Sequence, residues 1–291
     1  MIKNILYTSL FGLLLACGKT TEKTSDKSTE RVSDALIDSV YHYRSQHLKT
    51  DFLAQNHLDL SEEDAISIQL GMLARELAKG EKHIGWKMAG TVGDSSLFHP
   101  LFGYLLAKDS YGEGEAISVQ NFPGNEVMIE GEVGFVFNKD FPEGAASLED
   151  LKSGIDYVVG AVEFAQSNAL AMTDNPESAT TNHALAFGMG QAGSIIGSKK
   201  TTFGEYELEA EKVQCFVNDS LAAEGSSARV IGGHLNAVNA LVNMLPKYGQ
   251  KIRKGDVVIT GSLYVNPTVK EAVKSRVSFS SLGEIEFEIT D

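Results

Sequence analysis

The chain has 291 residues, of which 43% are hydrophobic and 22% charged, enough for one sizeable core. Its 39 acidic and 25 basic residues give a net charge of -14. Such a surface repels nucleic acid over most of its area, so we expect no nucleic-acid partner and favour a small ligand or a cation.

The first residues are expected to lie outside the folded domain. Residues 1–17 combine a charged start, an apolar run that is too short to span a bilayer comfortably, and the segment Leu14-Leu15-Ala16-Cys17. That segment looks like a bacterial lipobox, so we expect residues 1–17 to be a lipoprotein signal peptide that ends at a lipid-modified Cys17. An ordinary secretory signal and a buried N-terminal helix are the alternatives.

Residues 18–33 are polar and offer almost nothing to bury, which predicts a disordered tether. A signal peptide, a lipid-modified cysteine and a tether, in this order, fit an exported lipoprotein. We therefore expect membrane attachment through the lipid anchor only, at the periplasmic face of the outer membrane or at the cell surface.

Residues 34–291 are predicted to form a single domain, with a helical section at 34–83 and a β-rich core at 84–291. Apolar spacing and the serine caps Ser33 and Ser61 predict helices near 33–47 and 61–80, and shorter helices near 147–153 and 233–246. Short apolar runs between turn residues predict strands near 84–89, 101–107, 127–137, 156–166, 185–189, 206–218, 256–260 and 275–289. Strands and helices do not alternate, so the expected fold class is α+β with mostly antiparallel sheets.

Two glutamates, Glu130 and Glu132, interrupt the apolar run of residues 127–137. Side chains alternate between the faces of a strand, so both carboxylates point to the same side. Two like charges on an apolar strand repel each other and resist burial, and a divalent cation would relieve both effects. The pair is therefore a candidate metal site.

Glu163 is the only charge in the apolar run of residues 157–165. An ionised carboxylate in such a strand needs a partner, either a metal ion or a buried Lys or Arg, unless it lies at an exposed strand end. Three oxygen ligands would suit Mg²⁺ or Mn²⁺, which keep positions open for water or substrate. No His-x-x-x-His motif or cysteine pair indicates zinc.

Lys87 lies in the apolar segment 84–90, beside the only tryptophan of the chain. A partly desolvated lysine has a lowered pKa and can exchange protons near neutrality, although a lysine that reaches solvent from a strand is a common alternative. Near the C-terminus, Thr260-Gly261-Ser262 offers hydroxyl and N–H groups where glycine permits close approach. This segment can bind a carboxylate, or it can simply end a strand.

These residues belong to a series of short motifs that spans about residues 60–289. The motifs are Ala65-Ile66-Ser67-Ile68-Gln69, Gly85-Trp86-Lys87-Met88, Phe102-Gly103-Tyr104-Leu105, Glu130-Gly131-Glu132, Val162-Glu163-Phe164, Leu235-Asn236-Ala237 and Gly255-Asp256-Val257-Val258-Ile259-Thr260-Gly261-Ser262-Leu263. In this order they resemble A-Y-x-I-Q, G-x-K-[IV], F-G-x-L, E-A-E, L-E-[IV], P-L-N-A and G-D-I-I-L-T-G-[AST]-L of the fumarylacetoacetate hydrolase superfamily. The resemblance is closest to its 2-keto-4-pentenoate hydratase branch.

The resemblance implies a β-rich fold of mixed sheets around a metal centre, with N-terminal helices outside and assembly as a homo-oligomer. It implies that Glu130, Glu132 and Glu163 hold Mg²⁺ or Mn²⁺, and that the ion binds a 2-oxo acid and stabilises its enolate.

The resemblance also implies that Lys87 moves a proton and that Thr260 and Ser262 bind the substrate carboxylate. The implied activity is that of a hydratase, a carbon–oxygen lyase of aromatic catabolism. Such an enzyme adds water to a 2-hydroxy-2,4-dienoate, in its 2-oxo-4-enoate form, and gives a 4-hydroxy-2-oxo acid.

The chain departs from the family pattern at four places, one of which is a shorter stretch between Lys87 and Phe102. Asn168 stands where an arginine is usual, Thr181-Asn182-His183 lacks an aspartate, and Gly232-Gly233-His234-Leu235 lacks a proline. Decarboxylation of a 2-oxo dioic acid and C–C hydrolysis of an acylpyruvate therefore stay open. Hydrolysis would need a His–Glu pair, for which His99 and His183 are available. Export and the altered positions also leave open a lipid-anchored protein that binds a metal or a 2-oxo acid without turnover.

Overall fold

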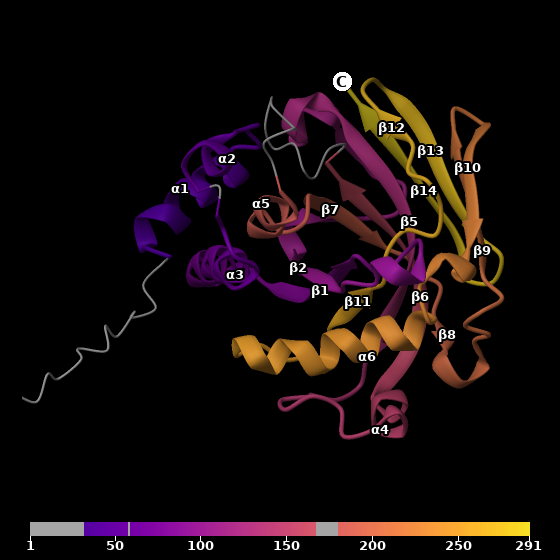
Figure 1. Ribbon diagram of the computed structural model, residues 1–291. Helices are drawn as coiled ribbons and strands as arrows, with labels where there is room; N and C mark the ends of the chain where they lie inside the picture. The colour runs from indigo at the N-terminus through magenta and orange to yellow at the C-terminus, as the bar shows by residue number, and fades with distance from the viewer. Residues whose placement is uncertain (1–31, 58, 167–179) are drawn as a thin grey trace, which may run out of the picture. The chain divides into compact units, whose positions relative to one another are not determined.

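The N-terminal section is helical, as the apolar spacing predicts. The computed structural model describes residues 32–57, 59–166 and 180–291, which belong to one compact unit (Figure 1). Helices α1 (Asp34–Ser45), α2 (Phe52–Asn56) and α3 (Glu62–Ala78) follow one another there. The hydroxyls of Ser33 and Ser61 accept N–H hydrogen bonds at the starts of α1 and α3, so both predicted serine caps are confirmed.

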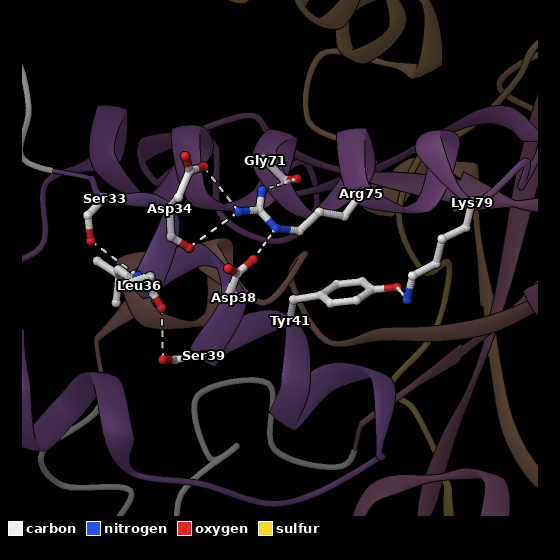
Figure 2. Close-up of polar contacts among 10 residues, drawn as sticks. Ser33, Asp34, Leu36, Asp38, Ser39, Tyr41, Gly71, Arg75 and Lys79 are labelled. Atoms are coloured by element: carbon white, nitrogen blue, oxygen red, sulfur yellow. Dashed lines mark hydrogen bonds and ion pairs between the residues drawn. The ribbon is translucent and has the colours of Figure 1, made fainter.

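Ion pairs join α1 to α3. Arg75 of α3 lies 3.1 Å from Asp34 and also pairs with Asp38, both on α1 (Figure 2). Solvent screens these largely exposed carboxylates, so each pair contributes little to stability. The buried side chains of α3, such as Ile68, pack into the main core and hold the helix in place more strongly.

The strands of the described residues form two sheets. The larger has nine strands, in the order β2-β1-β11-β5-β6-β7-β3 with β12 beside β5 and β8 beside β6, and the smaller has five, in the order β10-β9-β13-β14-β4. The strands are β1 (His83–Ala89), β2 (Leu101–Leu106), β3 (Ser110–Tyr111), β4 (Ala116–Ser118), β5 (Val127–Phe137), β6 (Ile155–Ala165), β7 (Gln191–Ile196), β8 (Thr201–Thr202), β9 (Lys212–Val217), β10 (Ser220–Ser226), β11 (Val257–Ile259), β12 (Thr268–Val269), β13 (Val273–Phe279) and β14 (Gly283–Thr290). Three pairs (β1–β11, β3–β7 and β4–β14) are parallel and the other described pairs are antiparallel, which confirms the predicted fold class.

Apolar side chains lie on both faces of the larger sheet. On β5, Ile129, Val133 and Phe135 pack into the main core. Val136 points the other way and belongs to a second, small cluster with Leu105, Ala161, Val257 and Ile259. The two glutamates of β5 alternate with the main-core residues, so they lie on the face of the small cluster.

The remaining helices are α4 (Leu148–Ser153), α5 (Thr181–Ala186) and α6 (His234–Met244). In Figure 1, α1, α2 and α3 gather on one side of the larger sheet, and the strands of the smaller sheet stand on the other side. Within the described ranges, no helix combines the length and the apolar composition that crossing a bilayer would require.

Some predicted elements are wrong. Residues 185–189 are not a strand: they end α5 and enter a turn, and the strand β7 begins at Gln191. A short buried apolar run, here 184–187, does not distinguish a helix from a strand, because both are apolar all round when buried. The predicted strand 206–218 begins only at Lys212, and the single strand predicted at 275–289 is the hairpin β13–β14. The prediction missed two helices, α2 and α5, and the strands β3, β4, β7, β8, β10 and β12.

Several expectations concern residues that the structure does not describe. The signal peptide with Cys17, nearly all of the predicted tether, and Asn168 lie outside the described residues. The lipid anchor, and the interpretation that Asn168 replaces the family arginine, therefore stay predictions.

The packing around Gly131 predicts the effect of a small substitution. Gly131 lies between the two glutamates but faces the main core, where an added Cβ would lie 2.7 Å from the Tyr264 ring. Gly131→Ala should lower the free energy of unfolding by about 1–3 kcal/mol, because the core is overpacked. Urea denaturation measures this loss. Gly204→Ala is the matched control, since nothing lies within 4 Å of a Cβ there, and equal midpoints for both variants would contradict the packing.

Candidate metal centre

Three carboxylates meet on the small-cluster face of the larger sheet. The antiparallel register of β5 and β6 places Glu163 directly opposite Glu130, and Glu132 lies two residues along the same face. One oxygen from each carboxylate can be chosen so that all three lie within 4.8 Å of one another. The structure therefore brings together the three residues that the sequence singles out as metal ligands.

The oxygens of this cluster are suited to a cation. Glu132 and Glu163 are fully buried. Glu132 Oε2 accepts a 2.7 Å hydrogen bond from the Gly261 N–H, whereas Glu132 Oε1 and Glu163 Oε2 have no hydrogen-bond partner among the described residues. Buried carboxylate oxygens without partners are unfavourable, and a divalent ion would provide the missing contacts. The residues present therefore fit a metal ion with oxygen ligands.

Burial and mutual repulsion change the acidity of the cluster. The pKa of Glu130 is raised to about 8, by burial first and then by the charge of Glu163, while Lys87 partly opposes both effects. The pKa of Glu132 is raised well above its usual value by burial first, and then by the charges of Glu163 and Glu130. The cluster therefore retains protons at neutral pH when no cation compensates its charge.

Lys87 of β1 completes the cluster. Its Nζ lies 2.9 Å from Glu163 Oε1 and donates a 3.0 Å hydrogen bond to the Met189 carbonyl. Burial opposes the positive charge, but the three carboxylates, Glu163 foremost, outweigh burial and raise the pKa of Lys87. The pKa lowering predicted from the sequence is therefore wrong, because it considered burial without the facing charges. The alternative of a lysine that reaches solvent also fails, since Lys87 is buried.

Thr260 and Ser262 follow β11 beside the cluster, and their hydroxyls have partners within the protein. Thr260 Oγ1 donates to the Val133 carbonyl at 3.2 Å and lies 2.9 Å from His234 Nδ1. Ser262 Oγ lies within hydrogen-bond distance of Tyr264 O and Asn266 Oδ1. That both residues bind the substrate carboxylate stays a prediction.

His234 supports this segment, and sequence reasoning did not identify it as a site residue. Its Nε2 lies 2.8 Å from Ser227 Oγ, and burial lowers the pKa of His234 to about 4, so the ring is neutral. Because Thr260 gives its proton to Val133 O, His234 must donate from Nδ1 and accept at Nε2. The ring therefore fixes Thr260, whose neighbour Gly261 holds Glu132. The available signals were its place in the family stretch Gly232-Gly233-His234-Leu235 and at the start of a predicted helix.

The other histidines considered from the sequence lie elsewhere. His99 Nε2 is 2.7 Å from Glu62, in a largely exposed pair between a loop and α3. His183 belongs to the capping box of α5, and its Nε2 lies 3.0 Å from His57 O. Ser194 of β7 was not predicted. It faces Glu163 from the neighbouring strand, buried and without a partner among the described groups, and an ordinary strand serine carries no sequence signal.

Known proteins resemble this chain in sequence. No family model matches it. The chain is 29% identical to the 2-hydroxyhexa-2,4-dienoate hydratase of Comamonas testosteroni over 215 residues, which are 72% of this chain and 80% of that protein. It is 27% identical to the 2-hydroxypent-2,4-dienoate hydratase of Pseudomonas putida over 222 residues, 74% of this chain and 96% of that protein.

The fold is also known. The structure of 4-oxalocrotonate decarboxylase from Pseudomonas putida G7 matches with a TM-score of 0.77 and 22% identity, over 87% of this chain and 95% of that one. The sequence relatives support the 2-keto-4-pentenoate hydratase branch of the fumarylacetoacetate hydrolase superfamily, and the solved structures show the same fold.

The superfamily motifs are distant in the sequence but adjacent in the fold. Four consecutive strands of the larger sheet carry four of them, in the order β1, β11, β5 and β6. Lys87 lies on β1, Thr260 directly follows β11, Glu130 and Glu132 lie on β5, and Glu163 lies on β6. In this fumarylacetoacetate hydrolase-type sheet, the four motifs on these strands therefore lie next to one another.

Removal of the metal should make stability depend on pH. The pKa of Glu130 is about 8 in the folded protein against an ordinary value of 4.5, so between these values the folded state holds a proton that the unfolded state loses. Stability should therefore fall as pH rises through this window. We expect the Tm of the protein in EDTA to decrease as the pH rises from 4.5 to 8. Glu130→Gln should make this decrease smaller, and Glu149→Gln, at an exposed position, should leave it unchanged. A Tm of the metal-free parent that stays constant with pH would contradict the raised pKa.

Proposed function

We propose that this protein is a hydratase that adds water to a 2-hydroxy-2,4-dienoate, in its 2-oxo-4-enoate form, and gives a 4-hydroxy-2-oxo acid. One observation carries the proposal: three carboxylates that fit a cation lie against a buried lysine in a single cluster. The curated relatives in Comamonas testosteroni and Pseudomonas putida are named as hydratases of such dienoates, which supports this substrate class.

Glu130, Glu132 and Glu163 are proposed to hold Mg²⁺ or Mn²⁺. The cluster offers oxygen ligands only, which suits these hard ions, and the similar 4-oxalocrotonate decarboxylase is described as a complex with magnesium and adipate. When bound, such an ion acts as a Lewis acid that polarises a 2-oxo acid and stabilises the charge of its enolate. The Gly261 N–H fixes one oxygen of Glu132, which leaves the other free for the ion.

Lys87 is proposed to move the proton. Its Nζ is held between Glu163 and the Met189 carbonyl, so it has a fixed position beside the cluster. In its charged form it can donate a proton to carbon as the dienol becomes the 2-oxo form, and the neutral amine can then accept a proton. The hydroxyl of water then adds to C4 of that 2-oxo form and a proton goes to C5, which gives the 4-hydroxy-2-oxo acid. Neutralisation of the carboxylates by a cation would lower the pKa of Lys87 and make this exchange easier.

Decarboxylation of a 2-oxo dioic acid is the second candidate. It needs the same stabilised enolate, and the fold shared with 4-oxalocrotonate decarboxylase favours it over C–C hydrolysis. The two reactions differ in whether the substrate carries a second carboxylate and whether CO₂ is released.

The function is tested by combining turnover with Mn²⁺ titration. The parent protein should convert 2-hydroxypenta-2,4-dienoate and bind Mn²⁺, with oxalate, a chelating mimic of a 2-oxo acid, tightening the binding. Lys87→Met should lower kcat by about 10²–10⁴-fold and keep Mn²⁺ binding, because it removes only the proton-transfer group. Glu163→Gln should lose both, whereas Lys139→Met, which removes an ion-paired surface lysine, should lose neither.

Other outcomes of this experiment would change the conclusion. Release of CO₂ from a 2-oxo dioic acid, without dienoate hydration, would favour the decarboxylase. Mn²⁺ binding without turnover of either substrate would overturn the enzyme and leave a lipid-anchored protein that binds a metal or a 2-oxo acid.

We further propose that the mature protein is a homo-oligomer, exported and anchored through Cys17, at the periplasmic face of the outer membrane or at the cell surface. The lipobox-like segment that ends at Cys17 and the polar residues 18–33 support the anchor. Cells fed a labelled fatty acid should incorporate the label into the parent protein and not into Cys17→Ser. Equal labelling of both would exclude Cys17 as the lipid site.

A further inference from the structure

The turn that accepts the Lys87 hydrogen bond has an unusual backbone. Gly188, Met189 and Gly190 follow one another at φ values of 78°, 56° and 74°. The left-handed region is easy for glycine but unfavourable for Met189, whose Cβ crowds the backbone there. Because Lys87 Nζ donates to Met189 O, the position of the amine depends on how this turn is held.

Arg44 of α1 holds both ends of that turn. Its Nη1 donates to the Phe187 carbonyl, immediately before the left-handed residues, and its Nη2 donates to Gln191 Oε1 at 2.9 Å, immediately after them. The guanidinium also lies over the Tyr104 ring, 5.1 Å from its centre. A planar group with several donors in a rigid arrangement can make these contacts together, which a lysine ammonium cannot.

The turn is tightly packed between Arg44 on one side and Lys87 on the other. An added Cβ at Gly103, the strand neighbour of Lys87, would lie 2.6 Å from Gly188 O and 3.2 Å from Lys87 Cγ. An added Cβ at Gly188 would lie 3.1 Å from Arg44 Nη1. A displacement of the turn would therefore reach Lys87 directly.

We propose that Arg44 is a positioning residue that acts through residues 187–191 to hold Lys87 Nζ against Glu163. The inference rests on the proposed role of Lys87 in proton transfer. It makes α1, a helix outside the sheets, part of the site. Arg75 joins the same helix to α3 without contacting the turn, so attachment of α1 and positioning of Lys87 can be separated (Figure 2).

Arg44→Ala and Arg75→Ala, made in the full chain, form the matched pair. Arg44→Ala should lower kcat about 10- to 100-fold with little change in KM, because a small displacement of the reacting group slows the reaction without removing a substrate contact. Its Mn²⁺ binding should be retained. Methylguanidine should restore part of the lost kcat in Arg44→Ala and none in Lys87→Met. Arg75→Ala should keep its kcat and unfold at nearly the temperature of the parent protein, because it removes only exposed ion pairs.

A second readout does not depend on turnover. Lys87 is buried and ion-paired, so an amine-reactive reagent should label it slowly in the parent and in Arg75→Ala, and several-fold faster in Arg44→Ala, as measured by mass spectrometry. Unchanged kcat or unchanged Lys87 labelling in Arg44→Ala would overturn the proposal. If the parent turns over no substrate, the proposed function fails, and the labelling rates by themselves decide whether Arg44 positions Lys87.

Discussion

Repulsion among three carboxylates, of which Glu132 and Glu163 are fully buried and Glu130 is half-buried, is the constraint around which the site is built. Strand pairing places Glu130 opposite Glu163, and strand alternation places Glu132 on the same face. The backbone therefore holds the three carboxylates close together. Burial first, and then this repulsion, raise the pKa values of Glu130 and Glu132. A metal ion and the Lys87 ammonium are the two positive charges that can compensate such a cluster. They are also the Lewis acid and the proton-transfer group that the proposed hydration needs.

The surroundings of the cluster limit how far its parts can move. The Gly261 N–H fixes Glu132, and the neutral His234 ring holds the hydroxyl of Thr260 next to it. On the other side, the turn before β7 receives the hydrogen bond of Lys87 and is itself held by Arg44. The strands therefore carry the carboxylates and Lys87, and we propose that a loop and an outer helix position Lys87.

Parts of the structure could be predicted because they depend on local periodicity. The alternation of residues 127–137 predicted both the strand and the shared face of its glutamates, and the serines at 33 and 61 predicted the starts of α1 and α3. The strand predicted at 185–189 is wrong for the converse reason. A short apolar run that is buried on all sides has no periodicity from which helix and strand can be told apart.

The sequence by itself determined the class of the fold and the identity of the three candidate metal-binding carboxylates, because unpaired charges in apolar strands are conspicuous wherever those strands lie. Only the tertiary structure decided the charge state of Lys87, since the carboxylates that reverse the effect of burial come from β5 and β6. It also decided the roles of His234 and Arg44. Each acts on groups distant in sequence, and which groups these are depends on the register of the strands and the docking of α1, which no local pattern encodes.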